Sequence, residues 1–380
     1  MNHKITFYPV GNGDCCLVSI GGANMKMMFD CNFRQKAENE NNDTFDVLDD
    51  LINNQLKVRC GLHYMDAFLL THPDEDHCRG FAEKFYLGDP DSISDDDKDA
   101  NKILISELWY SPRVFEEYTT DLSDDAKAFK KEAKRRMELF KSGSKKANNE
   151  GNRIRIIGWT DAEELKGLEE RITVPGHIVN EVNGHECKHF EMFIHAPFKE
   201  SIKNGSRNES SIVSQLRFMF DKNSNDIVRV FLAGDAEWYV WENIMAITKN
   251  NDFLKWDLLE APHHCSYTFF AEKRENEPNK ASIDFLNKKE TSAFVVASSK
   301  VIKKNDDNPP CQKAKNHYVE EVGNGNFFCT SGTSEDEVDK PLVFDIEDGE
   351  LGLHDDKQKT KSRQSSQIKD SKPHFYGQNF

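Results

Sequence analysis

Thr71-His72-Pro73-Asp74-Glu75-Asp76-His77 is the stretch that decides the fold of this chain, and it directly follows the apolar run Ala67-Phe68-Leu69-Leu70. An apolar run of this length predicts a buried strand, so the polar residues begin where the strand ends. Imidazoles and carboxylates bind divalent metal ions, and alternate side chains of a tight loop can reach different ions. The spacing therefore indicates a site for two adjacent metal ions, rather than a solvated acidic turn, built on His72, Asp74, Asp76 and His77.

Two later segments repeat the arrangement of an apolar strand that ends in a metal-capable side chain. In the first, a strand expected over residues 228–233 leads through Gly234 to Asp235. Glycine lets the backbone approach the site closely, and an aspartate placed there can bridge two cations. In the second, an apolar strand leads to the pair His263-His264, of which we assign His263 as a metal ligand and His264 as an auxiliary group. Histidines satisfied by hydrogen bonds in the core are the alternative for this pair.

The composition is that of a soluble protein, with 37% hydrophobic and 31% charged residues. The 380 residues suffice for one large domain with insertions or for two domains. No stretch approaches the roughly 18 consecutive apolar residues that span a bilayer. The first residues lack the apolar core and cleavage site of a secretory signal and are expected to form a strand. We therefore expect a cytoplasmic protein with no membrane partner.

Charge and cysteine content exclude further classes. The formal net charge of −16 argues against tight nucleic-acid binding through overall electrostatics, because phosphate-dominated affinity needs clustered cations, although a local basic surface is compatible with it. The nine cysteines are scattered without a Cys-x-x-Cys pair. Neither a disulfide framework nor a cysteine-rich zinc finger is therefore indicated.

The order of expected elements favours an α/β architecture with helices outside a sheet core. Strands are predicted over residues 5–10, 15–20 and 25–29, and the turn Gly11-Asn12-Gly13-Asp14 joins the first two. Apolar residues at helical spacing predict a helix over residues 44–57, and a further helix is expected to start at Cys78. The polar residues 355–380 are expected to form a flexible tail.

Between about residues 89 and 185 the pattern changes, and we interpret this region as an insertion over or beside the site. It contains a strand expected over residues 103–109 and a helix expected over residues 124–140. The helix is apolar at intervals of three or four residues and basic elsewhere, with Lys127, Lys130, Lys131, Lys134, Arg135 and Arg136. A basic face is commonly just solvated; the sharper hypothesis is a lid that contacts phosphate groups. The insertion is also a candidate surface for protein partners.

Together these motifs resemble those of the metallo-β-lactamase superfamily, and within it of the ComEC-type competence hydrolases. Six segments carry the resemblance: Val10-Gly11-Asn12-Gly13-Asp14, Phe29-Asp30, residues 71–77, Asn208-Glu209-Ser210-Ser211-Ile212-Val213, Leu232-Ala233-Gly234-Asp235 and Ala261-Pro262-His263-His264. They cover most of residues 1–330 apart from the insertion. The resemblance implies an αββα sandwich with the metals at one edge of two packed sheets, and a hydrolase domain over residues 1–350.

The resemblance carries the family's ligand roles to His72, Asp74, Asp76, His77, Asp235 and His263. The chain also departs from the family pattern. Asp74 stands where the superfamily commonly has histidine, and Cys265 stands where relatives usually have glycine. The histidine of the third motif has no clear equivalent, so Asn208, His195 or no residue takes its place.

Three carboxylates and three imidazoles form a harder ligand set than a histidine-dominated zinc site. Harder ligands favour Mn²⁺ or Mg²⁺, whereas raw affinity favours Zn²⁺. Two divalent ions about 3.5–4 Å apart lower the pKa of a bridging water and stabilise charge on a phosphoryl oxygen. The set therefore predicts a binuclear metallohydrolase that cleaves phosphodiesters, with nucleic acid as a candidate substrate.

Asp76, His264 and His317 are the candidate catalytic residues. His264 or His317 would position the scissile phosphate or protonate the leaving oxygen, although His317 is equally well a surface histidine. Two other functions compete with a phosphodiesterase or nuclease. One is hydrolysis of another ester, a thioester or a lactam, because the fold alone does not define a substrate. The other is a metal-stabilised interaction module in a bacterial defence or competence complex.

Overall fold

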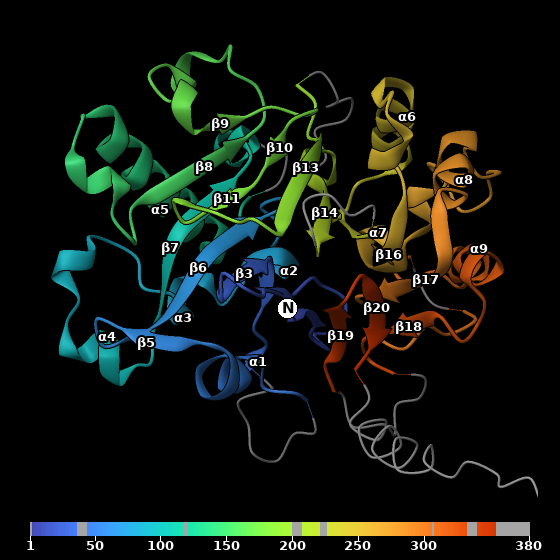
Figure 1. Ribbon diagram of the computed structural model, residues 1–380, viewed down its shortest axis with the longest axis horizontal. Coiled ribbons are helices and arrows are strands. Elements are labelled where there is room, and N and C mark those ends of the chain that lie inside the picture. Colours follow the sequence, from blue (N-terminus) through green and yellow to red (C-terminus); the bar gives the residue numbers. More distant parts are fainter. Residues whose placement is uncertain are drawn as a thin grey trace, which may run out of the picture.

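Two mixed β-sheets packed face to face organise the chain (Figure 1). A computed structural model describes residues 2–35, 44–116, 121–199, 207–220, 226–305, 308–332 and 340–354. The tail expected at residues 355–380 lies outside these residues. Within them, no helix is both long enough and apolar enough to cross a bilayer.

The first sheet has ten strands. Along the sheet they are β20 (Glu350–Leu353), β19 (Leu342–Glu347), β1 (Asn2–Phe7), β2 (Cys16–Ile20), β3 (Met25–Phe29), β6 (Leu62–Leu70), β7 (Ile103–Tyr110), β8 (Arg153–Ile157) and β9 (Ile172–Thr173), with β5 (Lys57–Arg59) paired to β6. From β3 to β9 the neighbours on this path run parallel, whereas β20 to β3 are antiparallel.

The second sheet has seven strands. In order they are β10 (Ile178–Val179), β13 (Phe190–Ala196), β14 (Val213–Met219), β15 (Ile227–Leu232), β16 (Trp256–Glu260), β17 (Lys289–Ala297) and β18 (Phe327–Cys329). β15 to β18 run parallel. A separate hairpin pairs β11 (Glu181–Val182) with β12 (His185–Glu186), and β4 (Cys31–Asn32) is a short strand after β3.

Helices cover the outer face of each sheet. The α-helices are α1 (Val47–Asp50), α2 (Glu75–Cys78), α3 (Phe81–Lys84), α4 (Asp95–Asp99), α5 (Asp124–Lys141), α6 (Trp238–Ile247), α7 (Pro262–Cys265), α8 (Lys280–Leu286) and α9 (Gln312–Val322). The π-helical turn η2 (Leu51–Gln55) continues α1. The short 3₁₀ turns are η3 (Pro90–Ser92), η4 (Pro112–Phe115), η5 (Lys145–Asn148), η6 (Glu163–Leu165), η7 (Glu169–Arg171), η8 (Arg207–Ser210), η9 (Asn251–Phe253) and η10 (Tyr267–Phe269).

Alternation of side chains along the strands produces the layers. Leu69 of β6 points into the core between the sheets, whereas its neighbour Phe68 packs with Phe129 of α5 on the outer face. In the second sheet, Val230 faces the shared core and Phe231 packs against Trp241 of α6. Successive strand residues point to opposite faces of a sheet, so each strand contributes to two cores. The predicted αββα sandwich is confirmed.

Several expected elements are confirmed, and others differ. β3 matches residues 25–29, and α5 covers the helix expected over residues 124–140. The helix expected from Cys78 is wrong, because α2 ends there and Gly80, with φ +85°, separates it from α3. The helix expected over residues 44–57 is shorter, because the chain leaves α1 through a π-helical turn and enters β5.

The region interpreted as an insertion, residues 89–185, supplies β7, β8 and β9 to the first sheet and α5 to its outer face. Buried Arg136 of α5 donates to the backbone carbonyls of Ile105, Ser106 and Arg153 and pairs with Glu132. This arginine therefore holds the helix on the sheet. Contact of the remaining cations with phosphate stays a prediction.

Candidate metal centre

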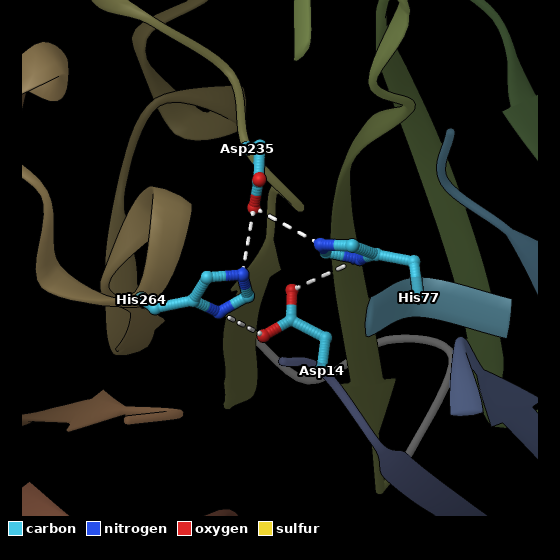
Figure 2. A group of neighbouring side chains, drawn as sticks. All are labelled: Asp14, His77, Asp235 and His264. Carbon is cyan, nitrogen blue, oxygen red and sulfur yellow. Dashed lines mark ion pairs between the residues drawn. The ribbon is translucent and has the colours of Figure 1, made fainter. Parts of the chain in front are cut away.

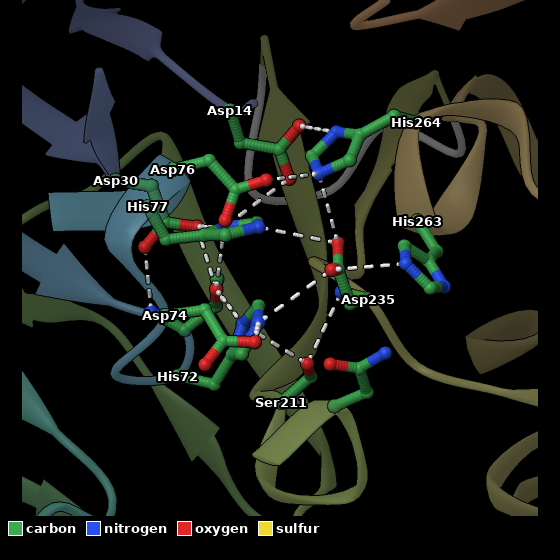
Figure 3. A network of polar contacts seen from close by, with 12 residues as sticks. Asp14, Asp30, His72, Asp74, Asp76, His77, Ser211, Asp235, His263 and His264 are labelled. Carbon is green, nitrogen blue, oxygen red and sulfur yellow. Dashed lines mark hydrogen bonds and ion pairs between the residues drawn. The ribbon is translucent and has the colours of Figure 1, made fainter. Parts of the chain in front are cut away.

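The predicted metal-binding residues come together beyond the ends of three strands. β6 leads directly into residues 71–77, β15 leads through Gly234 to Asp235, and β16 leads to His263 and His264. β3 and β6 are parallel, and so are β15 and β16, so their carboxyl ends lie at the same edge of each sheet. Figure 3 shows the side chains from both sheets converging on Asp235.

Gly234 lies where the second sheet closely approaches Thr71 of the first. Its φ is +49°, and a Cβ built there would lie 2.7 Å from Oγ1 of Thr71. An L side chain would therefore be strained and would clash with the metal loop. This is the close backbone approach expected at Gly234, and it lets Asp235 reach residues of the first sheet.

On one side of Asp235, two imidazoles face its Oδ2 atom. Nε2 of His72 lies 3.6 Å from Asp235 Oδ2 and 3.5 Å from Oδ2 of Asp74. Nε2 of His263 lies 3.6 Å from the same Asp235 oxygen. We call His72, Asp74, His263 and Oδ2 of Asp235 the first half-site.

On the other side, a second set faces Oδ1 of Asp235. Nε2 of His77 lies 3.2 Å from this oxygen and Nε2 of His264 lies 3.4 Å from it. The same nitrogen of His264 lies 3.3 Å from Oδ2 of Asp76. We call Asp76, His77, His264 and Oδ1 of Asp235 the second half-site.

The spacing of these atoms suits metal ligands. Ligands about 2.0–2.1 Å from a tetrahedral ion lie about 3.3 Å from one another, close to the separations in both half-sites. Several of the buried atoms, moreover, have no hydrogen-bond partner among the described residues: Nε2 of His72, His77 and His264, and Oδ1 of Asp235. Unpaired buried polar atoms are costly, and a cation between them would remove that cost. The residues therefore fit a metal site.

Electrostatics also favour a bound cation. Burial alone would raise the pKa of Asp235, but the surrounding histidines hold it well below its usual range. Burial opposes ionisation of His72 as well, yet the nearby carboxylates, led by Asp235, raise its pKa to about 9. The carboxylates therefore stay ionised, and protons on the histidines or a metal ion must balance them.

An outer layer of hydrogen bonds orients His77. Its Nδ1 lies 2.7 Å from Oδ2 of Asp30, and Asp30 accepts hydrogen bonds from the backbone N–H and the hydroxyl of Thr71. A carboxylate at Nδ1 keeps the proton on that nitrogen and leaves Nε2 free to bind a metal. Asp30 is thus a positioning residue.

Asp14 performs the same task for two histidines. Its oxygens lie 3.2 Å from Nδ1 of His264 and 3.7 Å from Nδ1 of His77. Asp14, His77, Asp235 and His264 form a buried group whose ligand atoms lie within 4.8 Å of one another (Figure 2). Asp14 faces the Nδ1 atoms of His77 and His264, whose Nε2 atoms face Asp235. Like Asp30, it is a carboxylate behind the ligands.

The first half-site has hydroxyl groups behind its ligands. Ser211 Oγ accepts from the backbone N–H of Asp235 at 3.1 Å and contacts Nδ1 of His72 at 3.3 Å. Nδ1 of His263 contacts Oγ1 of Thr268 at 2.9 Å. Hydroxyls can turn to suit either tautomer of an imidazole, so they orient these rings with less electrostatic bias than Asp14 and Asp30 provide.

Asp14, Asp30 and Ser211 belong to motifs of the sequence but are not among the residues predicted for the site. The signal was weak but present. Asp14 ends a Gly-Asn-Gly-Asp turn, and Asp30 directly follows an apolar strand, as Asp235 nearly does. The pair His263-His264 was expected to contribute one ligand and one auxiliary group, whereas the structure brings Nε2 of both rings to Asp235.

The two candidates for the third motif lie elsewhere. His195 is buried under β15, where its Nε2 lies 2.9 Å from the carbonyl oxygen of Phe253 and its ring stacks on Phe231. Asn208 donates through Nδ2 to Oε1 of Glu237. Among the described contacts, neither side chain reaches His72 or Asp235.

His317 lies on α9, where its ring packs against those of Tyr267 and Phe270. Its contacts within the described part of the chain do not include any half-site residue. Both a role for His317 in the reaction and the alternative of a surface histidine stay predictions; the ring is partly buried.

The histidine pair has an unusual backbone. His263, His264 and Cys265 all have positive φ, at 52°, 52° and 65°. Left-handed conformations cost non-glycine residues about 1–2 kcal/mol each. The turn points both imidazoles at Asp235, so the cost is incurred at the site where both rings are needed.

Comparisons with known proteins identify no family. No family model matches the chain, and no curated protein matches it either. A solved structure similar to this one is Zn(2+)-bound PqqB from Methylobacterium extorquens, with 11% identity and a TM-score of 0.32, covering 68% of this chain and 71% of that one. The αββα layers and the buried His/Asp cluster, taken from the structure itself, fit a metal-dependent hydrolase.

Proposed function

We propose that the protein is a binuclear metal-dependent hydrolase of phosphodiesters. The observation that carries the proposal is the position of Asp235, whose two carboxylate oxygens each face a different pair of imidazole nitrogens. A carboxylate placed in this way suits a bridge between two cations. The ComEC-type resemblance of the motifs agrees with this function and adds polynucleotides as candidate substrates.

In this proposal, one ion binds in the first half-site and the other in the second half-site. His264 is then a ligand rather than an auxiliary group, because it is fully buried and its Nε2 faces both Asp76 and Asp235. His263 serves the first half-site in place of the missing third-motif histidine. Two divalent ions held there would supply a water of lowered pKa for attack on an ester and positive charge for the phosphoryl oxygens.

Exposure of the ligands indicates where a substrate enters. The side chains of Asp74, Asp76 and His263 are 22%, 35% and 16% exposed, whereas those of His72 and Asp235 are 0% and 4% exposed. An ester therefore approaches over the three exposed ligands.

Phosphodiesters suit this site because of charge. The two divalent ions of the proposal would offer positive charge to an anionic ester at the exposed side, whereas the buried carboxylates Asp14 and Asp30 lie behind the ligands. Arg207, which pairs with Asp74 at the exposed side, adds a positive charge there. Neutral esters and lactams gain less from such a field.

The test combines metal analysis with a substrate panel. Purified protein should hold close to two ions per chain and hydrolyse bis(p-nitrophenyl) phosphate with Mn²⁺, and Asp235→Asn should lose both properties. Asp284→Asn is the matched control and should retain them, because the Asp284 side chain on α8 is 43% exposed and pairs with Lys280. A folded wild-type protein that holds metal but hydrolyses no substrate of the panel would favour the metal-stabilised interaction module, and one that binds no ion would reject the proposal. Metal binding with turnover of thioesters or lactams alone would reject the substrate class.

A further inference from the structure

Among the described ion pairs, Arg207 is the one arginine or lysine that contacts a half-site carboxylate. Its guanidinium Nε pairs with Oδ1 of Asp74, and its Nη1 donates to the carbonyl oxygen of Asp121 at 3.4 Å. Arg207 begins η8, and Ser211, directly after η8, contacts His72 and Asp235. This segment therefore lies along the first half-site.

The second half-site has the opposite electrostatic surroundings. Within the described residues, the ion pairs of Asp14, Asp30, Asp76 and Asp235 are all with histidines. Asp14 and Asp30 are buried and carry no ligand role in the proposal, so they add negative charge behind His77 and His264. A divalent cation is attracted by this charge, and the attraction is strong where water is excluded.

The ion pair with Arg207 has two effects on the first half-site. It occupies one oxygen of Asp74, so that Asp74 has only Oδ2 to offer toward His72. It also places a permanent positive charge beside the ligand, and arginine stays protonated at any physiological pH. Both effects weaken the binding of a divalent ion there.

We infer that the two half-sites load unequally, and that Arg207 sets the difference by holding Asp74 and opposing the ion of the first half-site. The inference rests on the proposed binuclear function. The second half-site fills first and remains filled, whereas occupancy of the first depends on the available metal. Activity would then follow the concentration of free divalent metal through the first half-site alone.

The test is titration of metal-free protein with Mn²⁺, followed by calorimetry and by the electron paramagnetic resonance signal of coupled Mn²⁺ pairs. Wild-type protein should bind two equivalents with different Kd values. Arg207→Met, which keeps an apolar stem without the charge, should lower the Kd of the weaker equivalent by about tenfold or more. The tighter equivalent should change less than twofold, and the coupled-pair signal should appear at lower Mn²⁺.

Arg79→Met is the matched control, because Arg79 directly follows α2, near Asp74 in sequence, but contacts Glu75 and Asn32 instead of a half-site carboxylate. It should leave both Kd values unchanged. Arg207→Lys keeps the charge, so both of its Kd values should stay close to those of wild type. This variant therefore separates the effect of charge from a loss of folding. If wild type binds two equivalents and Arg207→Met shifts neither, the inference is wrong while the binuclear function stands. If wild type and Arg207→Met each bind at most one ion, both are wrong.

Discussion

Oδ2 of Asp30 lies 2.7 Å from Nδ1 of His77, so a buried carboxylate behind the second half-site determines which nitrogen of the ring faces Asp235. Asp30 itself has φ +54° and accepts two hydrogen bonds from Thr71. The residue therefore links the end of β3 to the metal loop after β6. The pairing of β3 with β6 therefore helps to orient the ring of His77.

Replacing Asp30 by asparagine should weaken metal binding without removing a ligand. Asparagine tolerates positive φ and retains one oxygen that can accept from Thr71. It lacks the negative charge, however, with which Asp30 attracts the proton on Nδ1 of His77. Loss of such an outer partner typically costs 10–100-fold in metal affinity. Equilibrium dialysis with metal analysis measures this, and the weakened ion should be the one of the second half-site. An unchanged Kd for both ions would deny Asp30 its positioning role.

Removing bound metal should lower the thermal stability of the protein. An ion present at about 100 times its Kd stabilises the folded state by about 2.7 kcal/mol, and the unpaired atoms of His72, His77 and His264 would again be without partners. A thermal melt with and without EDTA should show a lower Tm in EDTA. Asp235→Ala should show no such difference, because it has lost the shared ligand. An equal response of both proteins would mean that the ion binds elsewhere.

Most of the framework could be predicted from the sequence, because periodicity and strand-end motifs are local. The apolar run before Thr71 predicts β6, and a polar loop after a parallel strand marks a site. The alternation of Leu69 and Phe68 likewise reflects a local pattern that the layers then use. Such signals need no knowledge of what lies opposite in the fold.

The remaining features depend on tertiary geometry. Asp14 and His264 are distant in sequence, and their 3.2 Å contact exists only because the β1–β2 turn meets the end of β16. The placement of both imidazoles at Asp235 depends on the left-handed backbone of His263 and His264, and their residue types do not favour that conformation. The contact between Arg207 and Asp74 could not be predicted for the same reason, because nothing near Arg207 in the sequence indicates it.

Acid should destabilise the fold through His195, a buried histidine outside the two half-sites. Burial lowers the pKa of His195 to about 3, although the carbonyl of Phe253 opposes the shift. Below the ordinary pKa of about 6.5 the unfolded chain takes up a proton that the folded chain does not. Stability conferred by the neutral ring is therefore present at neutral pH and is lost as pH falls from 6.5 toward 3.

Urea denaturation at pH 7 and pH 5, both in EDTA, measures this contribution. Wild-type protein should lose about 2 kcal/mol more than His195→Gln over this interval, because glutamine can still donate to the Phe253 carbonyl but does not titrate. The metal-site histidines titrate equally in both proteins, so their effect cancels in the difference. Parallel losses in the two proteins would show that His195 is protonated in the folded state.

At Cys265, substitution by glycine should destabilise the protein less than substitution by alanine, which is the reverse of the usual order. Its φ of +65° is a conformation that glycine adopts freely, whereas any Cβ is strained there. Both substitutions delete the buried thiol, so the difference between them isolates the backbone. Cys265→Gly should therefore be more stable than Cys265→Ala by about 1 kcal/mol, as measured by urea denaturation. At Cys16, which is buried within β2, glycine should instead be the less stable of the two, because it weakens a strand. Equal rankings at the two positions would mean that the turn at His263–Cys265 relaxes on substitution, and the orientation of both imidazoles would then not depend on it.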